Sequence, residues 1–121
     1  MLSFKTHIKM QTRKLKAKKD AAYKDAQFNL DSQILKDSNF FIPMQELNLA
    51  RSGILHSRLG LGLIRWKTKY ARRLYYNPQY NFSHDVNPNA QGLWYEAAKA
   101  LNKDAWKEIV QETYNKHFDG K

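Results

Sequence analysis

His84 and Asp85 form the adjacent pair of side chains in this sequence that is best suited to acid–base or metal chemistry. An aspartate beside a histidine can orient the imidazole ring, as general bases and metal ligands require. A working site also needs a nucleophile or further ligands, and the sequence places none at a recognisable spacing from this pair. The remaining histidines are scattered, without the four-residue spacing of a helical zinc motif: His7, His56 and His117. We therefore predict no catalytic residue, no metal ligand and no cofactor.

The composition and motifs of the chain exclude several other kinds of chemistry. The sequence contains no cysteine, so thiolate catalysis, disulfides and cysteine-type zinc sites are excluded. The segment Leu59-Gly60-Leu61-Gly62 lacks the later glycines and the Lys-Ser/Thr pair of a phosphate-binding loop, and it predicts a tight turn. No stretch approaches the roughly 20 apolar residues of a membrane-spanning helix, and we expect no membrane partner.

Positive charge is the strongest functional signal. The chain of 121 residues has a formal net charge of +10 at pH 7. This excess favours nucleic acid, an anionic membrane surface or an acidic protein as the partner, and charge alone does not choose among them. No acid occurs between Glu46 and Asp85. That interval contains a set of cationic residues, here called the cation block: Arg51, Arg58, Arg65, Lys67, Lys69, Arg72 and Arg73.

Part of the cation block alternates with apolar residues, which predicts a β-strand. Arg65, Lys67 and Lys69 would lie on one face, and the opposite face would hold Ile64, Trp66, Thr68 and Tyr70. Residues 51–59 are the expected partner strand, joined through the glycine turn into an antiparallel hairpin. Cations on such a face can hold a phosphate backbone, or line a DNA passage, without reading bases. The pattern fits a merely solvated strand face equally well, so the two interpretations stay open.

Aromatic residues gather in and after the predicted strand. Such side chains can stack on bases, but aromatics that alternate with charges in a strand more often belong to a core or a protein interface. We favour the core for Trp66, Tyr70, Tyr75 and Tyr76, and keep the whole set as interface candidates. The set consists of Trp66, Tyr70, Tyr75, Tyr76, Tyr80, Phe82 and Trp94.

These residues are expected to be positioned by an α+β domain with an N-terminal helix, a central antiparallel hairpin and C-terminal helices. Residues 1–19 contain no acid and many lysines, and they predict a basic N-terminal arm, either a frayed end or a contact to a polyanion. Residues 20–121 are the right length for a single domain. Asp20 is expected to cap a helix that runs to Lys36, and the cluster at 37–39 is expected to end it.

The C-terminal third divides into a loop and helices. Residues 77–92 are rich in Asn, Pro, Gln, Ser and Asp, which predicts a long exposed loop. Apolar residues then recur at helical spacing: Trp94, Ala98, Leu101, Ala105 and Ile109. Asn102-Lys103-Asp104 is expected to end one helix and to let Asp104 cap the next.

A series of short motifs follows along the chain: Asp37-Ser38, Phe41-Ile42-Pro43, Leu49, Ser52, Tyr70-Ala71, Asn87-Pro88-Asn89-Ala90-Gln91-Gly92, Leu93-Trp94-Tyr95-Glu96, Ala97-Ala98-Lys99 and Trp106. This order resembles the small minor capsid proteins of tailed phages, over about Tyr23 to Val110. The family pattern has Thr-Gly where this chain has Glu46-Leu47.

The resemblance implies a structural protein of the virion without a catalytic residue. It implies a head–tail connector, or tail-completion protein, in the neck between the capsid's portal-and-stopper stack and the tail. Such a protein would be assembled in the host cytoplasm as a homo-oligomeric ring, six-fold to match the tail, around the DNA passage. Its partners would be stopper or adaptor proteins on one side, tail terminator or tail-tube proteins on the other, and genomic DNA without sequence preference.

The residues themselves also fit a second function, that of a free basic nucleic-acid-binding module associated with ribosomes or DNA. A free module binds nucleic acid in isolation, and its affinity falls steeply with salt. A neck subunit is expected to bind weakly as a monomer and to need its ring neighbours. The two hypotheses therefore differ in the behaviour of the isolated chain.

Overall fold

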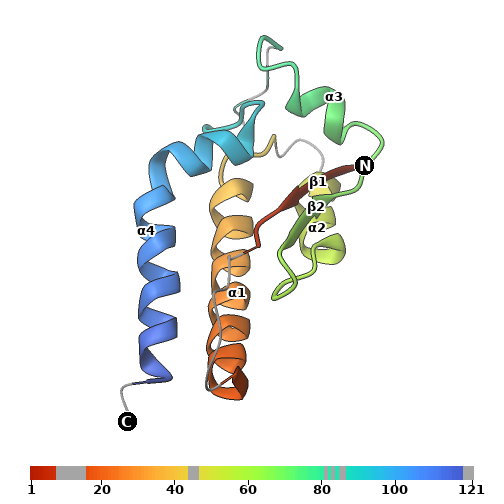
Figure 1. Ribbon diagram of the computed structural model, residues 1–121. Helices are drawn as coiled ribbons and strands as arrows, with labels where there is room; N and C mark the ends of the chain where they lie inside the picture. The colour runs from red at the N-terminus through yellow and green to blue at the C-terminus, as the bar shows by residue number, and fades with distance from the viewer. Residues whose placement is uncertain (8–15, 44–46, 81, 83, 85–86, 119–121) are drawn as a thin grey trace.

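The computed structural model describes residues 1–7, 16–43, 47–80, 82, 84 and 87–118 (Figure 1). Its elements follow in the order β1 (Leu2–Lys5), α1 (Lys16–Asn39), α2 (Leu47–His56), β2 (Leu63–Trp66), α3 (Ala71–Tyr75) and α4 (Trp94–Lys116). The helices and the two-stranded antiparallel sheet confirm the predicted α+β class.

The two long helices, α1 and α4, lie side by side and run in opposite directions (Figure 1). Side chains join them well away from the sheet. Asn29 Nδ2 donates a hydrogen bond to Thr113 Oγ1 at 3.1 Å, and the ring centroids of Tyr23 and Tyr114 lie 5.1 Å apart. The helix α4 bends, and in this view its first turns lie above the C-terminal end of α1 (Figure 1). The pair forms the long axis of the molecule.

The sheet brings the N-terminus against the middle of the chain. Its register pairs Leu2 with Trp66, Ser3 with Arg65, Phe4 with Ile64 and Lys5 with Leu63. Because successive side chains of a strand point to opposite faces, Leu2, Ile64 and Trp66 share one face, and all three are buried. The alternation predicted around Ile64 and Trp66 is thus present, although β2 ends at Trp66.

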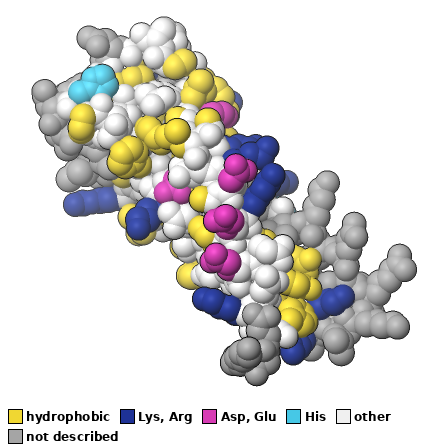
Figure 2. Space-filling view, turned by 90° about the vertical axis from the view of Figure 1, so that its left-hand side faces the viewer, with side chains coloured by type: hydrophobic (Ala, Val, Ile, Leu, Met, Phe, Trp, Pro, Cys, Tyr) yellow, Lys and Arg dark blue, Asp and Glu magenta, His cyan; other side chains and the backbone are white. Residues whose placement is uncertain are grey.

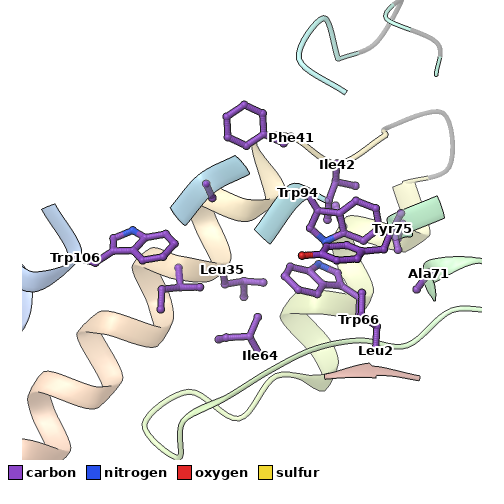
Figure 3. Close-up of a cluster of buried hydrophobic side chains, with 14 residues drawn as sticks. Leu2, Leu35, Phe41, Ile42, Ile64, Trp66, Ala71, Tyr75, Trp94 and Trp106 are labelled. Atoms are coloured by element: carbon purple, nitrogen blue, oxygen red, sulfur yellow. The ribbon is translucent and has the colours of Figure 1, made fainter. Parts of the chain in front are cut away.

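The core lies where the sheet meets α1, α2, α3 and the first turns of α4. Its buried members are Leu2, Ile34, Leu35, Phe41, Ile42, Leu49, Ala50, Ile64, Trp66, Ala71, Tyr75, Trp94, Ala98 and Trp106. Trp94 stands at its centre, with its ring centroid 5.9 Å from that of Trp66 and 4.8 Å from that of Tyr75 (Figure 3). Both contacts are edge-to-face, a favourable geometry for aromatic rings. Three aromatic residues therefore hold α3, α4 and β2 together.

The predicted partner strand at 51–59 is wrong, because residues up to His56 belong to α2. Side-chain hydroxyls following and within α2 take the place of a strand at the second edge of β2. Ser57 Oγ accepts the N–H of Arg65 at 2.9 Å, and Ser52 Oγ accepts the N–H of Lys67 at 3.2 Å. These bonds satisfy backbone donors that a neighbouring strand would otherwise have taken.

Glycines explain how closely α2 and the turn approach the sheet. A Cβ atom on Gly53 would lie 2.5 Å from Trp66 Nε1, so only glycine lets α2 pack here without displacing the indole. The predicted turn is confirmed: Arg58 and Leu63 form an isolated antiparallel bridge, and Gly60 and Gly62 adopt φ values of +89° and +73° between them. The turn of the hairpin exists, and its first strand does not.

The separation of residues 1–19 as an arm is also corrected. Residues 2–5 form β1, and Leu2 is buried in the core, because apolar residues alternate with polar ones in this segment and find their partner far along the chain. The helix α1 begins at Lys16 and not after Asp20, since lysine and alanine extend a helix readily. It ends at Asn39, beyond the expected end at Lys36, so the cluster at 37–39 forms its last residues. Residues 8–15 lie outside the described part.

The C-terminal helix is confirmed in type but not in its predicted break. The helix α4 is continuous through Asn102 and Asp104, and Asn102 Nδ2 donates to the carbonyl of Ala98 at 2.9 Å within it. The loop 77–92 contains no helix or strand in its described residues, and residues 81, 83, 85 and 86 lie outside them. Asn87 and Ala90 are buried, so the predicted exposure holds for only part of the loop.

Candidate nucleic-acid interface

The outer face of the sheet carries the first cations of the site. Arg65 lies opposite Ser3 in the register, and its Nε donates to Ser3 Oγ at 3.1 Å. Lys5 lies on the same face, two residues further along β1. Cross-strand neighbours of this kind are close enough to act on one ligand. Lys5 was expected in the basic arm and not beside the cation block, because the pairing of β1 with β2 is a long-range event that local patterns do not show.

The rest of the cation block comes from four further segments. Arg51 lies in α2, Arg58 in the turn, Lys67 and Lys69 in the link between β2 and α3, and Arg72 and Arg73 in α3. The prediction that Lys67 and Lys69 project from a strand is therefore wrong. They follow directly after it, where the chain turns into α3. The structure brings Arg65 and Lys5 onto one face, and the other cations lie on the four further segments.

These cations are available to an external anion. All members of the cation block are exposed except Arg65, which is half-buried. Within the described part of the chain, the only ion pair joins His117 and Asp25 at 2.6 Å, where α4 ends beside α1. Among the described residues, then, no acid neutralises the cation block. Arg73 instead lies 4.9 Å from the ring centroid of Tyr70, a cation–π contact that leaves its charge unchanged.

A buried carboxylate holds the turn that leads into this surface. Asp31 of α1 is fully buried, and its Oδ2 accepts the backbone N–H groups of Gly60 and Gly62, each at 2.9 Å. Its Oδ1 accepts the Thr6 hydroxyl and the Gln27 amide, the latter at 2.9 Å. One side chain thus ties together the residue after β1, the turn before β2, and α1. Nothing in the sequence pattern marks Asp31, since an acid within a helix usually faces water.

The seven aromatic interface candidates divide into two groups. Trp66, Tyr75 and Trp94 are fully buried in the core, so they are not free to contact a partner. For these three the interface assignment is corrected. The core interpretation holds for Trp66 and Tyr75, and it is wrong for Tyr70 and Tyr76, which are exposed. The candidates that keep surface are Tyr70, Tyr76, Tyr80 and the half-buried Phe82.

Tyr95, which sequence analysis named only within a motif, lies between two aromatic rings. It stacks on Phe4, with ring centroids 4.5 Å apart, and more loosely on Trp106, at 6.2 Å. Burial raises the pKa of the Tyr95 phenol above its ordinary value of 10.0, because the phenolate is poorly solvated there. The side chain is neutral at physiological pH and serves packing.

The described residues offer no arrangement suited to metal chemistry. His84 is exposed, and its Nε2 lies 3.0 Å from the carbonyl oxygen of Ala90, while Asp85 falls outside the described residues. In the part of the chain that the structure describes, no three His, Asp or Glu side chains are placed to hold a metal ion. Nor does any helix of that part have the length and apolar content to cross a membrane.

Residues of the short motifs form hydrogen bonds that connect separate segments of the fold. Asn87 Nδ2 donates to the carbonyls of Phe40 and Ile42, both at 2.8 Å, and so fastens the loop to the segment after α1. Asp37 Oδ2 accepts the indole N–H of Trp106 at 2.7 Å and joins α1 to α4. These motif residues make contacts within the fold and expose no reactive group.

The described residues combine exposed cations without ion-pair partners and a small α+β scaffold joined by motif residues such as Asp37, Asn87 and Trp106, which fits the class of a structural or binding domain. A family model described as "Minor capsid protein" matches residues 4–114 of this chain. The match covers most of the sequence, and the chain belongs to this family of phage minor capsid proteins. Membership gives the protein a structural role in the phage virion. No curated protein and no solved structure matched the chain.

Proposed function

We propose that this minor capsid protein is a head–tail connector, or tail-completion protein, of the virion neck. Its subunits form a homo-oligomeric ring, six-fold to match the tail, and assemble in the host cytoplasm. The ring stands between stopper or adaptor proteins and the tail terminator or tail tube. The protein is not an enzyme in this account, since its contribution is the geometry of the joint.

The observation that carries the proposal is the unpaired cation block on a protein of the minor capsid family. DNA presents a dense line of phosphates, and cations that face it replace its counterions whatever the base sequence. A passage lined in this way lowers the repulsion that packed DNA meets at its exit. Cations anchored to a sheet and a short helix keep their positions as DNA slides past, whereas a disordered tail would follow the strand.

The observed scaffold also explains why the cations remain unpaired. Burial of a fully hydrogen-bonded Asp31 fixes the turn from inside, so no surface acid is needed to hold this region. Because no described acid forms an ion pair with the cation block, its positive potential would be available to the lumen.

A salt titration of the isolated chain distinguishes the connector from the alternative function, a free nucleic-acid-binding module. We expect the monomer to bind duplex DNA with a Kd near the weak end of non-specific binding, roughly 10⁻⁴ M at physiological salt, without sequence preference. The physical reason is that one subunit presents few phosphate contacts and a ring presents many. Fluorescence anisotropy at several salt concentrations measures this.

Binding of the monomer at or below roughly 10⁻⁶ M at physiological salt would support the free module and contradict the neck proposal. The matched control is a variant in which Lys24, Lys36 and Lys116, exposed on α1 and α4, are changed to glutamate. Its net charge equals that of a variant with three reversals inside the cation block. If the cation block is the DNA-binding site, three reversals inside it should weaken DNA binding more than the three reversals on α1 and α4.

A further inference from the structure

An exposed strip on α2 combines apolar and cationic side chains. Ile54 is 66% exposed and Leu55 is 76% exposed, among the highest values for large hydrophobic residues in the described chain. Arg51 precedes them by one helical turn. The spacing i, i+3 and i+4 places Arg51, Ile54 and Leu55 along one side of α2, and the exposed Arg58 follows in the turn after the helix. We call Arg51, Ile54, Leu55 and Arg58 the α2 strip.

A second strip of the same spacing lies on α4 and has the opposite charge. Leu101 is 74% exposed, and Ala105 one turn later is exposed as well. Asp104 and Glu108 accompany them, both exposed and without an ion-pair partner among the described residues. Figure 2 shows acidic side chains in a column along this face of the molecule. We call Leu101, Asp104, Ala105 and Glu108 the α4 strip.

The two strips lie on helices that have α1 between them (Figure 1). The buried side of α2 packs toward β2, and α4 packs along α1 (Figure 1). α1 contacts both α2 and α4 and separates them. The α2 strip and the α4 strip therefore cannot meet within one subunit. Each exposes large apolar side chains to water, and the charges beside those side chains are opposite in sign.

We propose that the α2 strip of one subunit docks on the α4 strip of a second copy of this chain. Contact buries Leu55 and Ile54 against Leu101 and Ala105, and it pairs the arginines with Asp104 and Glu108. Apolar burial supplies the attraction, and the charge pairs select the partner and the direction of docking. Two copies of the same strip would instead bring like charges together, which disfavours a two-fold dimer.

A contact between two different strips on opposite sides is heterologous, and repeated contacts of this type close into a ring when the rotation permits. The inference thus rests on the proposed ring and names its subunit interface. It also divides the cation block. Arg51 and Arg58 serve the contact between subunits, which leaves Arg65, Lys67, Lys69, Arg72 and Arg73 for the DNA passage.

Because this chain has no native cysteine, it adds no background of its own to a cross-linking test, and an antibody against the chain identifies its cross-linked products. Leu55→Cys and Leu101→Cys are introduced together into the full-length protein, and purified particles that contain it are treated with a short bismaleimide. Both positions are highly exposed, so the fold tolerates the changes. The expected result is a ladder of covalent dimers, trimers and higher species on a denaturing gel. Each single variant should remain monomeric on that gel. In the proposed contact, position 55 of one subunit faces position 101 of the next subunit, and neither position faces the same position of another copy.

The matched control pairs Leu101→Cys with Gln79→Cys, an exposed position outside both strips, and should give no ladder. A double variant that stays monomeric in particles where immunogold labelling finds the protein at the neck would overturn the interface and leave the connector role standing. So would dimers formed equally well by either single variant. Absence of the protein from the neck would overturn the connector role together with the interface.

Discussion

Replacing Asp31 by alanine is expected to lower the free energy of unfolding by about 3 kcal/mol, a large part of the stability of a small domain. The buried carboxylate accepts hydrogen bonds from Thr6, Gln27, Gly60 and Gly62. Each donor left unsatisfied costs about 1–3 kcal/mol, while relief from burying a charge offsets part of the sum. Urea unfolding followed by tryptophan fluorescence measures the difference.

Asp25→Ala is the matched control for this substitution. Asp25 lies on the same helix, with its side chain 63% exposed and paired with His117. An exposed ion pair contributes about 1 kcal/mol or less, so this variant should unfold close to the wild type. If Asp31→Ala proved as stable as Asp25→Ala, the carboxylate would not be the anchor of β1 and the turn.

Reversing three charges of the cation block is expected to reduce the infectious titre by orders of magnitude while leaving the subunit folded. The residues chosen are Lys67, Lys69 and Arg72, all exposed. Arg65 is left unchanged because its bond to Ser3 helps to join β1 to β2. Glutamates on the passage wall would repel phosphates that the native cations attract. Complementation of a phage that lacks the gene, followed by plaque counts, measures the effect.

The control carries Lys24→Glu, Lys36→Glu and Lys116→Glu, which change the net charge by the same amount on exposed positions of α1 and α4. Surface substitutions of this kind shift stability by roughly 0.5 kcal/mol or less each, so both variants should keep the wild-type circular dichroism spectrum. Equal infectious titres for the two triple variants would contradict the proposal that the cation block faces DNA.

Much of the fold was open to prediction where the pattern is local. The alternation around Ile64 and Trp66 gave the buried face of β2, and the glycines at 60 and 62 gave the turn. The cluster at 37–39 gave the end of α1. In each case the residue type itself restricts the backbone, or the period itself fixes the buried face.

The prediction failed where distant segments decide the structure. Leu2 and Phe4 form a strand only because Trp66 and Ile64 lie across from them. Residues 51–59 were expected to form a strand, yet Ser52 and Ser57 supply the hydrogen bonds of a sheet edge from a helix and the turn after it. Tertiary contacts of this kind override the weak preferences of short segments.

The candidate site was predicted in part. The sequence shows that the cation block contains no acid, and its exposure was not evident until α2, β2 and α3 could be placed. Lys5 joined the surface only through the register of the sheet. The role of Asp31 was not predicted, because it depends on backbone donors of Gly60 and Gly62 that no sequence motif indicates. The DNA-facing role of these cations remains a prediction.

Electron microscopy of particles from a phage genome with this gene deleted, beside a complemented control, tests the connector role most directly. The account predicts that full heads and finished tails accumulate side by side without joining, and that complementation restores complete virions. Normally joined particles in the deletion would contradict it, and would favour the free nucleic-acid-binding module.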